Sequence, residues 1–375
     1  MKPGGVPRRS LLAGLAAVPV AVPVAALPVR HKRPAAWPPT VTGAAPDTAL
    51  DTLFNNYSDS GVGWTGADST YSVRLPDGRI VWIFSDTFLG PVNADGSRPT
   101  TAPFLNNSFV VQDGDQLSTV HGGTADAPAA LVEPADEGWY WAGAGNCSGG
   151  TLNVTYNQFV RTGTGLFDFA WKASALVRFD PAGLTPIDVT ALPSAVANLE
   201  SASWVLTDGG YTYVYRVEDQ GSTKYLHVAR VAGADLRAAW RFWTGSGWSA
   251  DETASARVLA GVSNEYSVTR LGDGYVLVTQ DTTELLSAHV VAYFGTSPTG
   301  PFTNKTALYT TPETGAAGSY GNGNIYTYNP HVHPELSDST NLVVSYNVNS
   351  FDNTDVYDDV SIYRPRFVTV GFGGV

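Results

Sequence analysis

The stretch that decides the fold is GADSTYSVRLPDGRIVWIFSD, residues 66–86. Apolar side chains alternate along both of its arms, and the dipeptide Asp77-Gly78 stands between them. This pattern predicts a β-hairpin with one buried face, because Asp-Gly favours the tight turns that join antiparallel strands. Asp68 and Asp86 flank the hairpin at similar distances from its turn, so we expect both carboxylates at one rim of the sheet.

The same hairpin signal recurs along the chain at a nearly constant spacing. Its turns are centred near positions 78, 149, 209, 273 and 339, and each hairpin is followed by a further pair of strand-like segments. Repeated units of about four antiparallel strands predict an all-β fold, a five-bladed β-propeller, in which the ring protects the sheet edges. A β-sandwich array or a parallel β-helix is the competing architecture, but a β-helix does not need Asp-Gly or Gly-Gly turns at every step.

The composition suits a turn-rich and aromatic-rich β protein. The 375 residues include 39 Gly, 24 Pro, 10 Trp, 18 Tyr and 15 Phe, and only 15% are charged. Such a bias is typical of strands and turns, not of helices. The single cysteine, Cys147, cannot form an internal disulfide. We expect it to be a small buried apolar residue, because no basic partner beside it would activate the thiol.

The N-terminus has the layout of an export signal. In residues 1–36 the pair Arg8-Arg9 precedes an apolar segment, which resembles a twin-arginine signal. An ordinary secretory signal or an uncleaved anchor is the alternative. We expect a Pro-rich and Ala-rich linker over residues 37–55 and a single propeller domain over residues 56–375, in a secreted protein that is not inserted in the membrane once the signal is removed.

The mature protein is strongly acidic. Residues 1–36 hold six of the 22 basic residues and none of the 34 acidic ones, so their removal leaves 16 basic against 34 acidic side chains, a net charge near −18. Such a charge opposes nucleic acid and anionic membranes as partners. Neutral polysaccharides and oligosaccharides remain open as substrates.

In a propeller the innermost strands line the central channel, so polar residues at their entries converge on one pocket. The segments before the five turns, with the end of the first hairpin, supply carboxylates, amides, histidines and loop aromatics. The candidate catalytic residues are Asp68, Asp86, Glu265 and Glu200, and the candidate substrate-binding residues are Trp64, Asn107, Trp139, Trp141, Asn264, His331 and His333. Paired carboxylates beside aromatic rings are the equipment for cleaving a glycosidic bond, since one carboxyl must be protonated and another ionised.

Several of these residues also have simpler interpretations. Asp68 could cap its own loop, Asp86 could end a strand, and Glu200 could be a solvated loop acid. His331 and His333 lie two residues apart and could bind a metal, but no third ligand has a defined spacing. We therefore expect no metal site and no required cofactor, and leave open a calcium ion in the channel or at the acidic residues 352–360. The tryptophans of residues 239–251 are expected to pack between blades.

A longer motif carries a family resemblance. The run GWTGADSTYSVRLPDGRIVWIFSDTFLG at residues 63–90, followed by NNS at 106–108, resembles the opening of secreted bacterial five-bladed propellers related to furanosidases, including endo-D-arabinanases of mycobacterial arabinan. The resemblance covers most of residues 50–371. It implies a glycoside hydrolase with essential aspartates at positions like Asp68 and Asp86, and a cleft at the propeller axis.

Two alternatives stay open. YSDSGVGW at residues 57–64 is similar to a degenerate sialidase Asp-box, and a sialidase would use three arginines, for which Arg74, Arg216, Arg364 and Arg366 are the candidates. A non-catalytic carbohydrate-binding propeller would use the same acids only as hydrogen-bond acceptors. We rank both below a glycosidase that acts on an arabinan-like, furanose-containing polysaccharide.

Overall fold

The computed structural model of the protein describes residues 37–165 and 167–375. The predicted export signal, residues 1–36, lies outside the described residues. Each of the five predicted hairpins is present, and each supplies the first two strands of a sheet. They are β3 (Tyr71–Arg74) with β4 (Ile80–Phe84), β11 (Trp139–Ser148) with β12 (Thr151–Arg161), β15 (Leu199–Asp208) with β16 (Tyr211–Asp219), β21 (Ser267–Leu271) with β22 (Gly274–Gln280), and β25 (Ile325–Val332) with β26 (Asn341–Ser350).

The turn chemistry explains why these segments pair. The pairs Gly149-Gly150 and Gly209-Gly210 have positive φ angles of 57° and 77°, and of 57° and 81°. Two consecutive left-handed residues form the turn that matches the twist of antiparallel strands, and glycine adopts this conformation without a steric penalty.

Further antiparallel strands complete the sheets. In sheet order they are β7 (Ser108–Asp113) and β8 (Gln116–Val120); β13 (Phe169–Phe179) and β14 (Pro186–Ala191); β17 (Lys224–Ala232), β18 (Arg241–Trp243), β19 (Trp248–Ser249) and β20 (Leu259–Ala260); β23 (His289–Gly295) and β24 (Thr303–Thr310); and β27 (Pro365–Gly373) with β1 (Thr40–Pro46). The expected all-β fold is confirmed.

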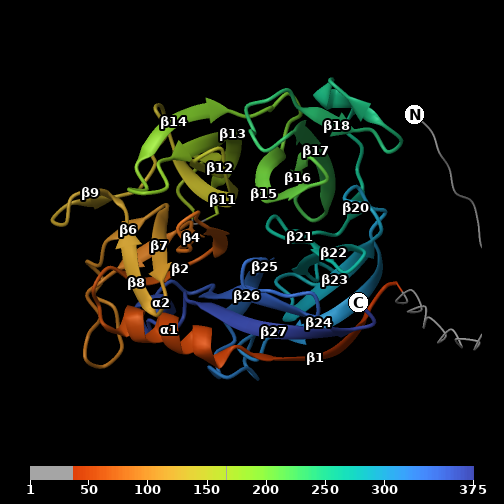
Figure 1. The fold of residues 1–375 in the computed structure, drawn as a ribbon. Helices are drawn as coiled ribbons and strands as arrows, with labels where there is room; N and C mark the ends of the chain where they lie inside the picture. Colours follow the sequence, from red (N-terminus) through yellow and green to blue (C-terminus); the bar gives the residue numbers. More distant parts are fainter. Residues whose placement is uncertain (1–36, 166) are drawn as a thin grey trace, which may run out of the picture. The chain divides into compact units, whose positions relative to one another are not determined.

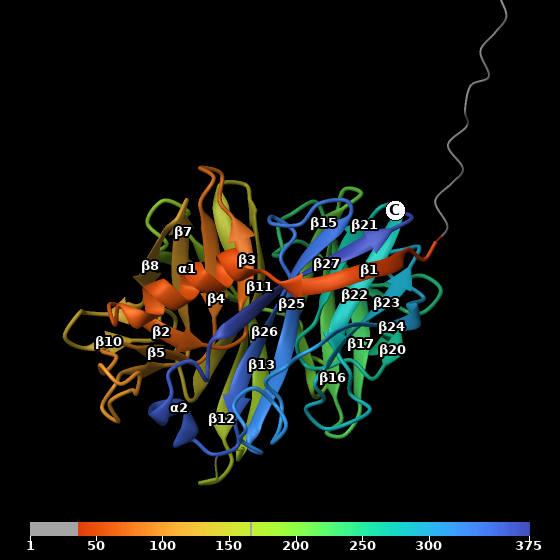
Figure 2. The ribbon, with the colours of Figure 1, turned by 90° about the horizontal axis from the view of Figure 1, so that it is seen from below.

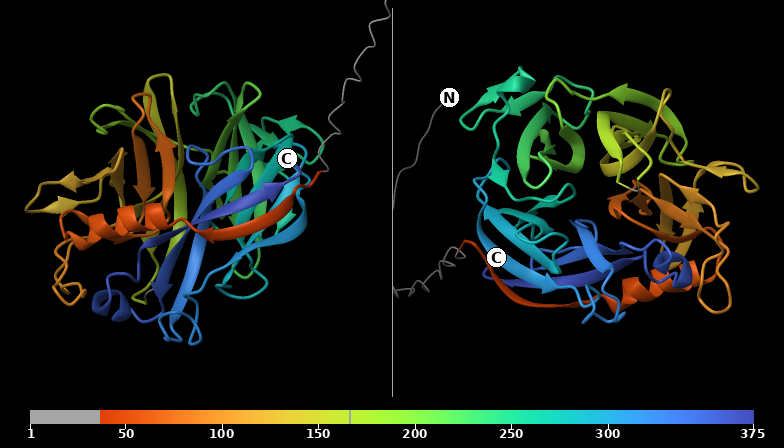
Figure 3. Two further views of the ribbon diagram at one scale, coloured as in Figure 1. Left: turned by 60° about the horizontal axis from the view of Figure 1, so that its bottom comes forward. Right: turned by 180° about the vertical axis from the view of Figure 1, so that it is seen from behind.

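The five larger sheets follow one another around a common centre, as the two views along it show (Figures 1 and 3). The first strand of each hairpin lies innermost, because β3 contacts β11, β11 contacts β15, β15 contacts β21, and β21 contacts β25. Buried aliphatic and aromatic side chains fill the space between neighbouring sheets. Cys147 packs at the edge of this core, and partial burial raises the pKa of its thiol.

The remaining elements are small. They are the three-stranded sheet β2 (Trp64–Ala67), β5 (Thr87–Leu89) and β6 (Phe104–Leu105), the two-stranded sheet β9 (Gly122–Gly123) and β10 (Pro128–Ala129), the helices α1 (Thr48–Asp59) and α2 (Asp355–Asp358), and a 3₁₀ turn at Glu252–Ala254. None of the helices in the described part of the chain is long and apolar enough to span a membrane.

The linker expected over residues 37–55 is wrong. Residues 40–46 form β1, which pairs antiparallel with β27, and α1 begins after Asp47, whose carboxylate accepts the Leu50 N–H at 3.2 Å. Figure 2 shows β1 beside β27, and α1 in front of the strands of the first large sheet. The Pro-rich and Ala-rich composition hid this strand, because its partner β27 lies at the other end of the chain.

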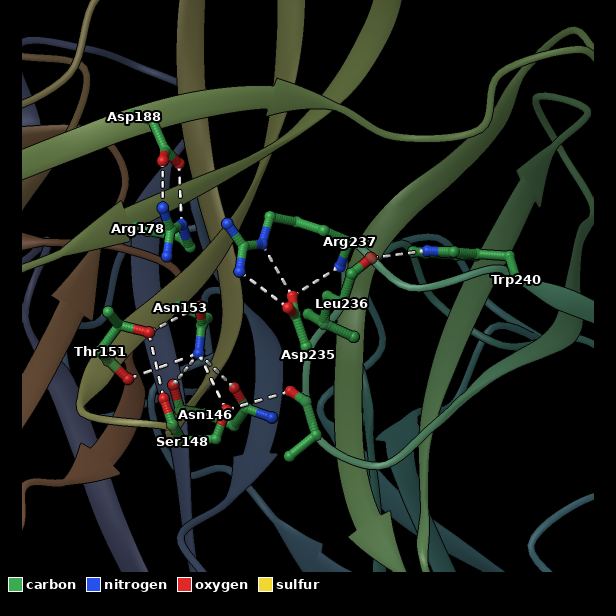
Figure 4. Close-up of polar contacts among 11 residues, drawn as sticks. Asn146, Ser148, Thr151, Asn153, Arg178, Asp188, Asp235, Leu236, Arg237 and Trp240 are labelled. Atoms are coloured by element: carbon green, nitrogen blue, oxygen red, sulfur yellow. Dashed lines mark hydrogen bonds and ion pairs between the residues drawn. The ribbon is translucent and has the colours of Figure 1, made fainter.

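A loop after β17 fastens the third large sheet to the second (Figure 4). Ser148 Oγ at the turn between β11 and β12 donates to the Ala234 carbonyl at 3.1 Å, and the neighbouring Leu236 side chain is fully buried. Trp240 Nε1 donates to the Leu236 carbonyl at 2.8 Å. Trp240, Trp243 and Trp248 all pack partly buried against the core, as the sequence predicts.

We predict that β1 is needed for full stability although it lies near the N-terminus. A protein that begins at residue 47 loses a ladder of six residue pairs, and should unfold at a midpoint lower by on the order of 5 °C, because each lost hydrogen bond contributes about 1 kcal/mol. Calorimetry of this protein beside one that begins at residue 37 checks the prediction. Equal midpoints for the two would contradict it.

Candidate active site

The two aspartates that flank the first hairpin lie side by side. Strand β2 pairs with β5 through Ala67 and Thr87, and the ladder continues as the Asp68 N–H donates to the Asp86 carbonyl at 3.2 Å. The Ser85 N–H donates in return to the Asp68 carbonyl at 3.1 Å. The shared rim predicted from the hairpin is therefore present, and both side chains line one cavity.

Asp68 is held by two phenols from the far end of the chain. Tyr328 and Tyr363 both donate to Asp68 Oδ2, at 2.7 and 3.0 Å, while Oδ1 is buried without a hydrogen-bond partner in the described residues. Burial raises the pKa of Asp68 to about 6, and the two phenols oppose this rise because they stabilise the carboxylate. An unpartnered buried carboxylate oxygen is uncommon and marks a place where a ligand can complete the bonding.

Asp86 has different partners. Asn106 Nδ2 and Trp141 Nε1 donate to its Oδ1 at 3.0 and 2.8 Å. Burial, and after it the negative charge of Asp68, raise the pKa of Asp86 to about 7. The two carboxyls thus titrate near neutral pH, and between about pH 6 and pH 7 the pair with a single proton is the most populated form.

A third carboxyl, Glu265, faces the same cavity. Ser69 Oγ lies 2.9 Å from Glu265 Oε1 and 2.8 Å from Ser85 Oγ. Ser69 Oγ is the donor in the contact with Glu265, and Ser85 Oγ donates to the Ala142 carbonyl at 3.2 Å. Burial, and then the charge of Asp68, raise the pKa of Glu265 well above its ordinary value, while the hydrogen bond from Ser69 opposes this rise.

The cavity has a volume of about 660 Å³ and a mixed lining. The three carboxyls lie beside amides and many aromatic rings, and Arg161 is the arginine among the lining residues of the described chain. Trp139 and Trp141, both predicted from sequence, line it with partly exposed rings. A cavity of this size, in which carboxyl, amide and hydroxyl groups lie among aromatic rings, is suited to a sugar-sized ligand.

Other predicted substrate-binding residues lie elsewhere. Trp64 is fully buried, with its ring 5.6 Å from Phe54 and 5.3 Å from Phe84, so the expectation of an exposed sugar-binding ring is wrong. Asn107 is also buried and bonds only to backbone, donating to the Val132 and Tyr140 carbonyls at 2.9 Å each. Its side chain fixes a loop and does not line the cavity.

Glu200 and Asn264 are likewise outside the cavity. Asn157 Nδ2 donates to the buried Glu200 at 2.9 Å, and burial followed by the charge of Asp219 raises the pKa of Glu200 to about 8. Asn264 Nδ2 donates to Asp219 Oδ2 at 2.8 Å. Glu200 is therefore a neutral buried acid, neither a solvated loop residue nor a group within reach of a ligand in this cavity.

The two histidines form a buried layer behind Glu265. The His331 ring lies 4.0 Å from Tyr71, with its Nε2 3.4 Å from Glu265 Oε2, and His333 Nδ1 lies 2.5 Å from Ser72 Oγ. Neither lines the cavity. Burial lowers the pKa of His331 well below its ordinary value and that of His333 to about 3, so both rings are neutral. We interpret them as supports and not as substrate-binding groups.

The residues that sequence reasoning missed are chiefly Tyr328 and Tyr363. Tyr363 has a φ of +88°, which is strained for a residue with a side chain. A Cβ on Gly66 would lie 2.5 Å from the Tyr363 carbonyl oxygen, so only glycine at 66 allows this approach. The alternation of apolar residues gave no signal for either tyrosine, because the contacts with Asp68 span 260 and 295 sequence positions.

The structure does not favour the sialidase alternative. The Asp-box-like sequence begins in helix α1, not in a turn between strands. Asp59 within it pairs with Arg364 at 2.9 Å. The four arginines considered for a carboxylate-binding triad are not among the described residues that line the cavity; they are Arg74, Arg216, Arg364 and Arg366.

In the described part of the chain no group of three or more His, Cys, Asp or Glu side chains is placed to hold a metal ion. The acidic residues 352–360 serve turns instead: Asp352 accepts the Thr354 N–H at 2.9 Å, and Asp355 accepts a hydrogen bond from Asn322 at 2.8 Å. A calcium ion in the channel stays a prediction from sequence.

Comparison with known proteins places the chain in a family. Residues 51–371 match the family described as Domain of unknown function (DUF5005). The chain belongs to this family. A search of the curated proteins gave no match.

Solved structures show a related fold. A protein from Bacteroides ovatus ATCC 8483, reported provisionally as a hydrolase, matches with 22% identity and a TM-score of 0.74, over 87% of this DUF5005 chain and 90% of that chain. At this identity the likeness establishes the fold alone. A GH43_1 enzyme from Xanthomonas citri (13% identity, TM-score 0.47, 88% and 90% of the two chains) and the catalytic domain of a Coprinopsis cinerea GH62 α-L-arabinofuranosidase (11%, 0.48, 83% and 94%) match more distantly.

We predict that Asp86→Asn stabilises the protein at high pH. The folded pKa of about 7 exceeds the unfolded value of about 3.9, so the wild type loses stability as pH rises through this window, and the variant lacks that loss. Its unfolding midpoint should exceed that of the wild type by several degrees at pH 8 and by less at pH 5.

Thermal unfolding at both pH values, with Asp77→Asn as control, checks this. Asp77 is exposed, and its hydrogen bond with Arg79 lowers its pKa, so its variant should show no gain at pH 8. An Asp86→Asn midpoint that gains nothing between pH 5 and pH 8 would contradict the prediction.

Proposed function

We propose that this protein is a secreted glycosidase that cleaves an arabinan-like, furanose-containing polysaccharide through Asp68 and Asp86. The observation that carries the proposal is the pair itself: two adjacent carboxyls at one cavity, with pKa values of about 6 and about 7. A glycosidase needs one protonated and one ionised carboxyl at its working pH. Glu265 is a third carboxyl in the same cavity, and burial raises its pKa well above its ordinary value.

The proposal includes a five-bladed propeller as the scaffold. Five sheets of four or more strands, each beginning with an inner hairpin, support this interpretation. Active sites of ring-like β folds form where loops at one end of the inner strands meet, and Asp68 precedes β3 as Glu265 precedes β21. The described cavity lies at these entries.

The hydrogen bonds suggest which aspartate plays which role. Two phenols stabilise the Asp68 carboxylate, so it ionises first and acts as nucleophile. Asp86 keeps its proton to higher pH because ionised Asp68 repels a second charge, and it acts as the acid. In the proposed reaction the Asp68 carboxylate bonds to the anomeric carbon, while Asp86 protonates the leaving oxygen. Asp86 then deprotonates the water that releases the sugar from Asp68.

Retention of the anomeric configuration follows from this assignment. A carboxylate that attacks the anomeric carbon forms a covalent intermediate that water then opens from the same face, so the two displacements together retain the configuration. The anomer released first, followed by proton NMR, tests this part of the proposal.

Substrate class and export rest on sequence observations. The resemblance of residues 63–90 to furanosidase-related propellers implies arabinan, and the basic and apolar pattern of residues 1–36 implies export. The acidic net charge and the three cavity carboxyls favour a neutral glycan over an anionic one.

We predict that Asp68→Asn and Asp86→Asn each lower reducing-sugar release from arabinan and mycobacterial arabinogalactan by about a thousandfold or more, because each removes one half of the acid and nucleophile pair. Asn keeps the shape of the side chain, so arabinan binding should persist. If the wild type binds these glycans but releases no sugar, the protein is a carbohydrate-binding protein and the proposed hydrolase activity is refuted.

We further predict a bell-shaped pH profile of kcat/KM with limbs near pH 6 and pH 7. Below the first limb Asp68 is protonated and cannot attack; above the second Asp86 has lost its proton. Tyr363→Phe removes a donor that lowers the pKa of Asp68, so the acidic limb should move to higher pH. Tyr140→Phe, a buried phenol outside the cavity lining, is the control. An unmoved acidic limb in Tyr363→Phe would overturn the assignment of Asp68.

A further inference from the structure

The cavity has two aromatic walls, and each wall bonds to a different aspartate. The first wall comes from β11 to β13 and contains Trp139, Trp141, Phe167 and Phe169. The second wall comes from the last sheet and the segment before β27 and contains Tyr326, Tyr328 and Tyr363, and Phe351 packs on Tyr326 just outside the cavity lining. Trp141 donates to Asp86, whereas Tyr328 and Tyr363 donate to Asp68.

The first wall extends outward from Asp86 as a continuous set of rings. The Trp141 ring lies 5.0 Å from Phe169, and Trp139 lies 5.7 Å from Trp141. Phe167 precedes Phe169 by two residues and also lines the cavity, with 65% of its surface exposed. An exposed ring beside other aromatic rings of a cavity adds to an apolar surface, and such surfaces mark binding sites more than single exposed side chains do.

The second wall repeats this arrangement on the side of Asp68. The rings of Tyr326 and Tyr328 lie 5.4 Å apart, and Phe351 lies 4.6 Å from Tyr326. Phe351 follows Ser350, a lining residue, and 49% of its surface is exposed. Each wall therefore combines a hydrogen bond to one aspartate with an exposed phenylalanine in or beside it.

We infer that a neutral glycan chain lies across both walls, with sugar units bound on either side of the bond that is cleaved, and that Phe167 and Phe351 bind the outer units. The inference rests on the proposed function and adds the cleavage mode and two specificity-determining residues. Sugar rings present C–H faces that pack on aromatic rings, and three carboxyls at the cavity disfavour an acidic sugar.

Binding on both sides of the reacting bond has a chemical consequence. A chain held by subsites on two walls is cut internally, and the products are oligosaccharides before they are single sugars. Contacts with units remote from the reacting carbon also hold that carbon against the aspartate pair, so long substrates gain more than short ones.

The test compares Phe167→Ala, Phe351→Ala and their double variant with wild type on linear arabinan and on a single-unit aryl arabinofuranoside. Wild type should release a range of oligosaccharides first. Each variant should raise KM for arabinan about five- to tenfold more than KM for the aryl furanoside, the loss expected for an aromatic contact of about 1 kcal/mol. Ile187→Ala, on the outer strand β14 and 51% exposed, is the matched control and should behave as wild type.

The failures of the two proposals are distinguishable. Single sugars released from the chain end alone, or equal effects of the variants on both substrates, would overturn the two-wall inference and leave the hydrolase intact. If wild type cuts no arabinan, calorimetric titration of Asp86→Asn with arabinan oligosaccharides of increasing length decides the inference. Weaker binding after either phenylalanine is removed supports the two walls in a protein that does not hydrolyse, and unchanged binding overturns them.

Discussion

The tight reversal at Ser69 and Thr70 is the constraint on which the cavity depends. Both residues are buried and left-handed, with φ angles of 71° and 57°, a conformation that costs about 1–2 kcal/mol for each residue with a side chain. Because of the reversal, the backbone of Asp68 bonds to that of Asp86, and the innermost strand β3 begins only three residues later. Hydrogen bonds offset the strain: Asn347 Nδ2 donates to Thr70 Oγ1 at 2.8 Å, and Ser69 Oγ bonds to Ser85 and Glu265.

The reversal also brings three buried carboxyls together, and each has different hydrogen-bond partners. Asp68 receives two phenol donors and is the easiest to ionise, whereas burial raises the pKa of Glu265 well above its ordinary value although Ser69 donates a hydrogen bond to it. Asp86 lies between these limits, since an indole and an amide stabilise its charge while Asp68 opposes it. Because three buried charges would repel strongly, their pKa values separate, and this separation provides an acid and a base in one small volume.

Local patterns in the sequence predict the parts of this arrangement that local chemistry decides. Glycine turns and alternating apolar residues are sufficient for the five hairpins, and the symmetry of one hairpin is sufficient to bring Asp68 beside Asp86. Contacts between distant segments are not encoded in that way. Trp64 and Trp141 both stand beside glycines and small residues, but only the docking of helix α1 decides that Trp64 is buried while Trp141 faces the cavity. The same limit hid β1, whose partner strand lies more than 300 positions away.

The contact between the last sheet and the first links completion of the fold to formation of the site. Tyr363 immediately precedes the segment that leads into β27, and its N–H donates to the Val348 carbonyl at 3.0 Å. Its carbonyl then rests on Gly66, and its phenol reaches Asp68. Asp68 therefore gains its donors only when the last sheet is in place against the first. Before that, the Asp68 carboxyl lacks the two hydrogen bonds that lower its pKa. A partly folded chain in which β2 already pairs with β5 would hold the two aspartates side by side, but neither carboxyl would be easier to ionise than the other.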